Sequence, residues 1–137
     1  MESAPISDRS AVGQPTPMPS LDGAPDFFRA AFEQARKANR PVIVDFWASW
    51  CAPCLRLKRE TFHAPEVASA LEFTTLIYVD LDEHLELGTK WGVHSVPNVF
   101  FIDRQGRIVD RLYRFEAPAA FLARLKKLLG DSRRTSQ

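Results

Sequence analysis

The sequence has little of what places a protein in a membrane or on a nucleic acid. Its 137 residues carry a net charge of only +1, so no overall field favours a nucleic acid or an anionic lipid surface. No apolar run approaches the roughly 18 residues that span a bilayer, and the N-terminus lacks the basic and apolar regions of a signal peptide. We therefore expect a cytoplasmic monomer with no nucleic-acid partner and no membrane span. A periplasmic protein is the alternative if the sequence is a mature form.

Cysteine is scarce, and this limits what the two cysteines do. A disulfide between Cys51 and Cys54 closes too short a loop to stabilise the fold much, because the stabilisation grows with loop length. A structural zinc site needs four ligands, and the three histidines lack the usual spacing. Asp80, Asp82 and Glu83 form an acidic cluster, but helix capping by Asp82 is preferred over a cation site. We predict no metal and no bound cofactor, and a redox-active pair Cys51–Cys54.

The strongest pattern in the sequence runs from Val42 to Cys54. Residues 42–48 are apolar and rich in β-branched side chains, which predicts a buried strand. Helix formers follow the second cysteine, so Cys51 is placed at the N-terminus of a helix. Free N–H groups and the helix dipole favour a thiolate there, which makes Cys51 the candidate nucleophile. Cys54 is the candidate resolving thiol one turn later, and Pro53 suits the first helical turn.

The remaining sequence predicts alternating helices and strands. The expected elements are a helix ending near 39, strand 42–48, a helix from 55 with a new start near 65, strand 73–80, helix 82–90, strands 98–102 and 107–112, and a helix over 118–129. This order predicts an α/β fold, with a central mixed β-sheet flanked by helices on both faces. The Pro-rich residues 1–21 predict a disordered arm, residues 22–130 the folded domain, and residues 131–137 a flexible tail.

Three separated motifs resemble the thioredoxin family. They are Val-Asp-Phe-Trp-Ala at 44–48, Trp-Cys-Ala-Pro-Cys at 50–54 and Ser-Val-Pro-Asn at 95–98. The resemblance runs from about residue 24 to 129 and implies the thioredoxin fold and thiol–disulfide exchange. It also implies that Pro97 is cis and lies against the disulfide. The backbone of Val96 beside it is then expected to pair with an extended substrate segment. From the residues alone, a trans proline that starts an edge strand remains the alternative.

Asp45 is the unusual residue of the predicted strand. A carboxylate is costly to bury in its charged form, so we expect the pKa of Asp45 to rise. A raised pKa suits a proton acceptor for Cys54, and the resemblance implies that role for this aspartate. A solvated side chain that points outward is the alternative. Tyr78 stands where many thioredoxins carry a lysine that partners the aspartate, which removes one influence on this pKa.

Two tryptophans flank the cysteines. Trp47 and Trp50 each supply an apolar surface and an N–H donor beside the thiols. We predict that Trp50 contacts the substrate and that Trp47 supports the site, with plain packing as the alternative for both. Arg56, Lys58 and Arg59 are predicted to form a solvated helix face.

The segment after the cysteines bears on the direction of the reaction. Residues 60–67 resemble the corresponding segment in the C-terminal domain of DsbD-type periplasmic reductases, whereas Ala52-Pro53 is close to the Gly-Pro of reducing thioredoxins. We therefore predict a thiol–disulfide oxidoreductase that reduces protein disulfides and is recharged by a thioredoxin reductase. A dedicated periplasmic reductant or interchange protein fed by a membrane thiol reductase is the alternative. A redox-independent binding or chaperone module is the alternative from a different class.

Overall fold

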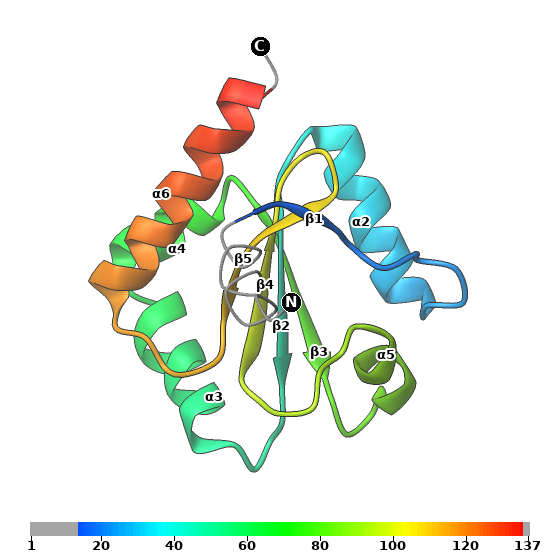
Figure 1. The fold of residues 1–137 in the computed structure, drawn as a ribbon. Coiled ribbons are helices and arrows are strands. Elements are labelled where there is room, and N and C mark those ends of the chain that lie inside the picture. Colours follow the sequence, from blue (N-terminus) through cyan, green and yellow to red (C-terminus); the bar gives the residue numbers. More distant parts are fainter. Residues whose placement is uncertain (1–13, 136–137) are drawn as a thin grey trace, which may run out of the picture.

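The computed structural model describes residues 14–135, with their side chains as far as residue 130. A five-stranded sheet forms its centre, in the order β1-β5-β4-β2-β3 (Figure 1). Its strands are β1 (Thr16–Pro17), β2 (Val42–Trp47), β3 (Thr75–Asp80), β4 (Asn98–Ile102) and β5 (Arg107–Leu112). β2 and β3 are parallel, and the other neighbours are antiparallel. The predicted mixed sheet is confirmed.

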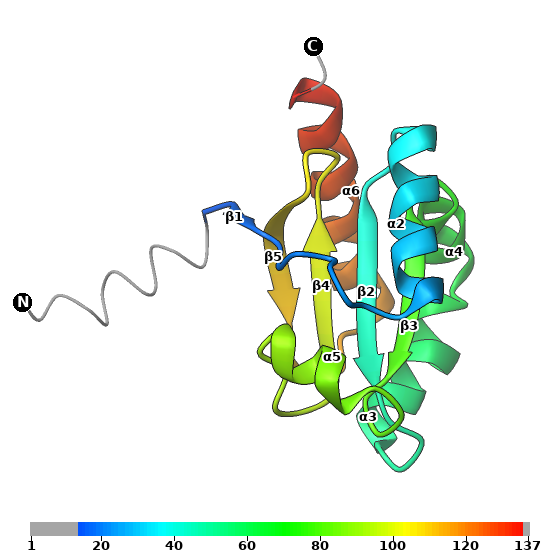
Figure 2. The same cartoon turned by 90° about the vertical axis from the view of Figure 1, so that its right-hand side faces the viewer.

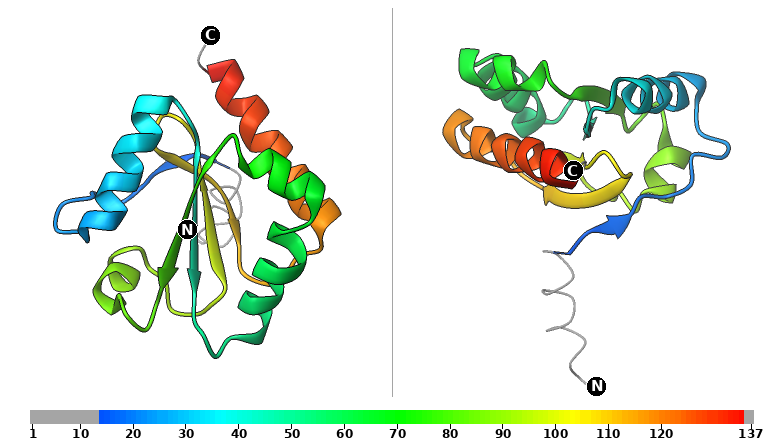
Figure 3. Two further views of the ribbon diagram at one scale, coloured as in Figure 1. Left: turned by 180° about the vertical axis from the view of Figure 1, so that it is seen from behind. Right: turned by 90° about the horizontal axis from the view of Figure 1, so that it is seen from above.

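Helices cover both faces of this sheet, as predicted. One face carries α2 (Asp26–Ala38) and α5 (Leu85–Lys90). The other face carries α3 (Ala52–Arg56), the π-helical segment η1 (Leu57–Phe62), α4 (Pro65–Leu71) and α6 (Pro118–Thr135). Figures 1 and 3 show the two groups on opposite sides of the strands. No helix in the described part of the chain is long and apolar enough to cross a membrane.

Alternating side chains of β2 supply both cores, because successive residues of a strand point to opposite faces. Val44 and Phe46 pack in the core under α2, together with Phe28. Ile43 packs in the core under η1, α4 and α6, together with Phe121. The apolar run of β2 therefore reflects burial on both faces of the sheet.

Two connections are fixed by residues that adopt left-handed backbone. Asn39 ends α2 with φ 58° and Pro41 lies two residues later, so the predicted helix end near residue 39 is confirmed. The β4–β5 turn has Gly106 at φ 79°. Asp103 Oδ1 accepts hydrogen bonds from the backbone N–H groups of Gln105 and Arg107, each at 2.9 Å, which closes the turn.

Ordered structure extends further at both ends than the sequence predicted. β1 lies inside the predicted disordered arm and pairs with β5, and Met18 and Leu21 pack against the core. Pro17 lacks an N–H group, which is tolerated in such an edge strand. The prediction for residues 1–13 lies outside the described residues. At the other end α6 continues through Gly130 to Thr135, since one glycine inside a helix costs only about 1 kcal/mol.

The chain topology brings three loops to one edge of the sheet. β2 and β3 end at this edge and β4 begins there, because Phe46 pairs with Asn98 and Trp47 with Asp80. The edge carries the β2–α3 loop, the β3–α5 loop and the loop that enters β4. It lies at the bottom of Figures 1 and 2.

Candidate active site

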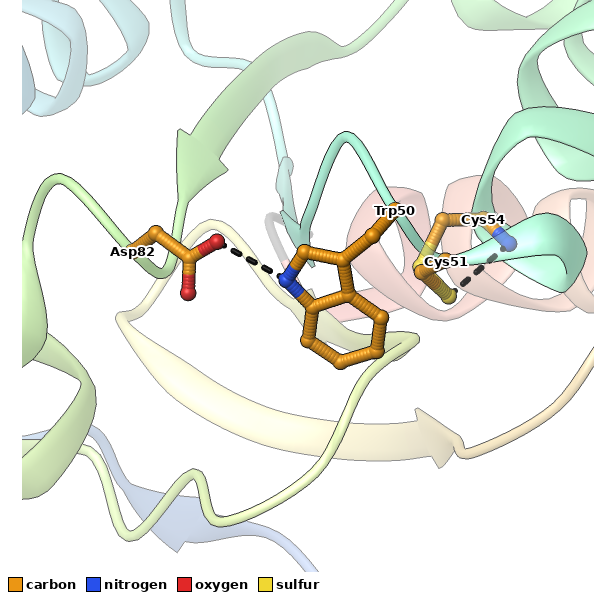
Figure 4. Close-up of a disulfide and its surroundings, with 4 residues drawn as sticks. All are labelled: Trp50, Cys51, Cys54 and Asp82. Carbon is orange, nitrogen blue, oxygen red and sulfur yellow. Dashed lines mark hydrogen bonds between the residues drawn. A yellow bond between two sulfur atoms is a disulfide. The ribbon is translucent and has the colours of Figure 1, made fainter.

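Cys51 and Cys54 form a disulfide at the start of α3. Cys51 is the N-cap residue, and its Sγ accepts a hydrogen bond from the Cys54 backbone N–H at 3.2 Å (Figure 4). Cys54 is fully buried and Cys51 is 4% exposed, while Pro53 occupies the first helical turn. After reduction, the same N–H group and the helix dipole stabilise a thiolate on Cys51. The predicted placement of both cysteines at the helix N-terminus is confirmed.

The loop that enters β4 closes one side of the disulfide. The Val96–Pro97 peptide bond is cis, which is the geometry that the family resemblance implies. Val96 packs against a small buried cluster formed by Ala48, Cys51 and Cys54. Residues from the β2–α3 loop and the loop before β4, distant in the sequence, are thereby brought together at the thiols.

Trp50 lies on the outside of the site. Its side chain is 69% exposed, and its indole N–H donates a hydrogen bond of 2.8 Å to Asp82 Oδ2 (Figure 4). The prediction that Asp82 caps the following helix is wrong, because α5 begins after His84 and has no side-chain cap.

Within residues 14–130 no group of three or more histidines, cysteines and carboxylates is arranged to hold a metal ion.

Asp45 lies inside the protein, on the face of β2 that α3 and η1 cover. Its side chain is 0% exposed, which rules out the solvated alternative. Among the described residues neither carboxylate oxygen has a hydrogen-bond partner. Burial raises the pKa of Asp45 from 3.8 to about 7, and the positive charge of Lys58 partly opposes this rise. The expected rise in the pKa of Asp45 is therefore found, and it brings the titration of this carboxyl group near neutral pH.

Lys58 is the residue of the site that the sequence analysis missed. Its Nζ lies 3.3 Å from the ring centroid of Trp47 and 4.4 Å from that of Tyr78. The predicted solvated helix face is confirmed for Arg59, whereas Lys58 turns inward and is only partly exposed. A signal was present in the sequence, because Lys58 follows Cys54 by four residues and such pairs share a helix face.

Comparison with known proteins assigns this site to a family. The model of a thioredoxin-like domain matches residues 28–129, most of the chain. The chain belongs to the thioredoxin-like family. The disulfide at the helix N-terminus, which the structure forms from Cys51 and Cys54, is the redox centre of a thiol–disulfide oxidoreductase.

Proteins similar to this chain include one that the match covers almost entirely and one that is much longer than the match. A thioredoxin from Alicyclobacillus acidocaldarius is 32% identical over 100 residues, which cover 73% of this chain and 92% of that protein. The thiol:disulfide interchange protein DsbD of Vibrio vulnificus strain CMCP6 is 34% identical over 100 residues, or 69% of this chain. The match spans only 17% of that DsbD protein.

Solved structures give the same result. The reduced C-terminal domain of DsbD from Neisseria meningitidis superimposes with a TM-score of 0.65 at 27% identity, covering 74% of this chain and 94% of that domain. A thioredoxin from Thermus thermophilus reaches a TM-score of 0.70 at 24% identity, covering 80% of this chain and 89% of the other. The second likeness supports the thioredoxin fold alone.

Proposed function

We propose that the protein reduces protein disulfides through the Cys51–Cys54 dithiol. The observation that supports this most is the position of Cys51 Sγ, which accepts the Cys54 N–H at the first turn of α3. This position lowers the cost of a thiolate, and the thiolate is the species that attacks a disulfide. Cys54 is more deeply buried, which suits a thiol that reacts only with Cys51.

The first step forms a mixed disulfide. The Cys51 thiolate attacks one sulfur of the substrate disulfide, so a bond forms between Cys51 Sγ and that sulfur while the substrate S–S bond breaks. The second substrate sulfur leaves as a thiolate and takes a proton from water. Trp50 immediately precedes Cys51 and exposes its indole, and Val96 before the cis Pro97 packs against the cluster that contains Cys51 and Cys54. We assign to them the contact with an extended substrate segment.

The second step releases the reduced substrate. Cys54 gives its thiol proton to the Asp45 carboxylate, and the resulting thiolate attacks Cys51 Sγ. The Cys51–Cys54 bond forms, the bond to the substrate breaks, and the substrate sulfur leaves as a thiolate that takes a proton. The protein dithiol is oxidised and the substrate disulfide is reduced. Asp45 suits this step because its pKa of about 7 lies close to neutral pH.

Turnover requires a reductase partner that restores the dithiol. Similarity to thioredoxins favours a thioredoxin reductase and a cytoplasmic location. Similarity to DsbD proteins favours a second arrangement, in which a membrane thiol reductase supplies a periplasmic protein. Recharging the purified protein with a thioredoxin reductase and NADPH supports the first arrangement, and failure to recharge a protein that dithiothreitol does reduce supports the second.

Cysteine variants test the proposed function. We expect Cys51→Ser to lose reduction of insulin disulfides entirely, because no nucleophile remains. Cys54→Ser is the matched variant, and it should attack once and stop at the mixed disulfide. Full retention of cellular function by Cys51→Ser would instead identify a redox-independent binding module.

The reduction potential then tests the direction of the reaction. Equilibration with glutathione and dithiothreitol buffers should give a value near the thioredoxin figure of about −270 mV. A value near about −120 mV, which is typical of a strong oxidant, would contradict the role as a reductant.

A further inference from the structure

Lys58 lies over two aromatic side chains, one on each of two neighbouring strands. Asp45 pairs with Tyr78 across β2 and β3, and Trp47 pairs with Asp80 in the same register. In parallel strands these pairs share one face of the sheet, and Lys58 lies over the two aromatic rings on that face. The ammonium group is thereby close enough to Asp45 and Asp80 for the charge of each carboxylate to act on it.

The π-helical segment fixes the position of this lysine. Leu57, immediately before it, is fully buried in the core between the sheet and α6. His63, at the end of η1, hydrogen-bonds through Nδ1 to the Lys58 carbonyl oxygen at 2.6 Å. The backbone on both sides of Lys58 is therefore held. Single π-helical turns within helices often occur at functional sites.

The charges of Asp45, Asp80 and Lys58 act on one another. Partial burial lowers the pKa of Lys58, and the negative charges of Asp45 and Asp80 partly oppose this change. Burial and the negative charge of Asp45 raise the pKa of Tyr78 to about 12, so Tyr78 stays neutral. From β4, the residue opposite Asp45 is the apolar Val99. Among the described residues, Lys58 is the cation that acts on Asp45.

We propose that Lys58 is the positioning residue that stabilises the Asp45 carboxylate and so lets Asp45 accept the Cys54 proton at neutral pH. The lysine that many thioredoxins place on the strand is replaced here by Tyr78, and the cation comes from the helix instead. This inference rests on the proposed function, because it concerns the second step of the same reaction.

The chemical requirement is simple. A carboxyl group buried beside no cation holds its proton above neutral pH and is then unable to accept another. Lys58 favours the charged carboxylate, so a larger fraction of Asp45 is ready to receive the proton from Cys54 Sγ. In this step the proton moves from Cys54 Sγ to the Asp45 carboxylate, Lys58 donates none, and only sulfur atoms are oxidised or reduced.

The two steps are separated by mixing the reduced protein with Ellman's reagent in a stopped-flow instrument. The first release of thionitrobenzoate reports attack by Cys51, and the second reports attack by Cys54 on the mixed disulfide. For Lys58→Met we expect the pH midpoint of the second phase to rise by about one unit, since a nearby opposite charge lowers a carboxyl pKa by about 1–3 units. The first phase should change much less.

Three further variants distinguish an electrostatic effect from a structural one. Lys58→Arg should restore the midpoint of the wild-type protein. Arg59→Met removes the same charge one residue later, from an exposed side chain paired with Glu60, and should leave the midpoint unchanged. In the double variant Lys58→Met/Tyr78→Lys the cation moves to the strand, and we expect the midpoint to return towards the wild-type value.

Carbon-13 NMR of the Asp45 carboxyl in the oxidised proteins gives the same titration without any reaction. Coincident titrations of the wild-type protein and a folded Lys58→Met protein would overturn the inference about Lys58. Such a result would leave the proposed function intact, because the wild-type protein would still reduce insulin. Failure of wild-type insulin reduction would instead overturn the proposed function while the Asp45 titration remained measurable.

Discussion

The two faces of β2 are built from alternate residues of one strand, yet they have opposite character. On the α2 face, Val44 and Phe46 lie in an apolar core whose neighbouring aromatic rings have centroid separations of 5.0–6.3 Å. The rings belong to Phe28, Phe32, Phe46, Trp91 and Phe100. On the opposite face, Ile43 and Trp47 flank the buried carboxyl group of Asp45. One face is thus apolar throughout, and the other contains a titratable group.

The α2 face of the sheet mainly stabilises the fold, whereas the opposite face carries the group that takes part in the chemistry. Edge-to-face ring pairs add to the free energy of folding beyond the apolar area that they bury. A carboxyl group without a hydrogen-bond partner among the described residues works against that free energy whenever it is charged. The α2 face is therefore expected to offset the cost that the Asp45 face imposes.

The largest effect is expected from breaking the apolar face. Phe28 is 0% exposed and contacts the rings of Phe32 and Trp91. Phe28→Ala should lower the free energy of unfolding by about 3–5 kcal/mol, through lost burial and the cavity left behind. Urea denaturation of the oxidised protein measures this loss. The reduction potential should stay unchanged, because Phe28 lies across the sheet from Asp45.

Phe27 offers a matched control one residue earlier. Its side chain is 42% exposed and contacts His84 at the surface. Phe27→Ala should cost well under half as much as Phe28→Ala. Equal losses in the two variants, or a changed potential in a folded Phe28→Ala protein, would show that the two faces do not act separately.

A second prediction concerns the pH dependence that Asp45 imposes on stability. Its pKa is raised from 3.8 to about 7 in the folded protein, so the folded state binds this proton more tightly than the unfolded state does. The stabilisation that this proton gives to the folded protein is fully present below about pH 4 and is lost as the pH rises through about 7. A pKa shift of this size changes the free energy of unfolding by roughly 4 kcal/mol at most.

Asp45→Asn removes this titration and provides the comparison. Between about pH 4 and 7 the free energy of unfolding of the wild-type protein should fall relative to that of Asp45→Asn, and the difference should level off above pH 7. Taking the difference cancels the titration of the other carboxyl groups. Parallel pH profiles for the two proteins would mean that Asp45 keeps an ordinary pKa despite its burial.

The sequence predicted those features of the site that local patterns determine. The strand before the cysteines and the helix after them follow from residue types between positions 42 and 60. For Asp45 the residues left burial and a solvated side chain open, and the family resemblance favoured burial. Contacts between distant segments were not predictable in this way. Asp82 follows a strand and suits a helix cap, but its carboxylate accepts instead from Trp50, far away in the sequence. β1 was missed because two residues show no periodicity.

The contacts of Lys58 were also not predictable from the local sequence pattern, although the residue lies close to the cysteines in the sequence. Three cations in four residues, Arg56, Lys58 and Arg59, indicate an exposed face. Arg56 does pair with Glu60 at the surface. Only the path of η1 over the strands determines that the middle one reaches Trp47. The spacing from Cys54 indicated the helix face, but the aromatic rings that receive the ammonium group come from two strands brought together by folding.

The smallest effect is expected from Tyr78→Phe, which tests what holds Lys58 on the functional face. The ring of Tyr78 lies 4.4 Å from Lys58 Nζ, and its hydroxyl stays neutral because burial and Asp45 raise its pKa to about 12. Phenylalanine keeps the ring face that attracts the ammonium group. We therefore expect a stability within about 0.5 kcal/mol of the wild-type protein and an unchanged Asp45 titration by carbon-13 NMR. A clear shift of that titration in Tyr78→Phe would mean that the hydroxyl group also acts on the carboxylate, and that Lys58 alone does not account for the charge on this face.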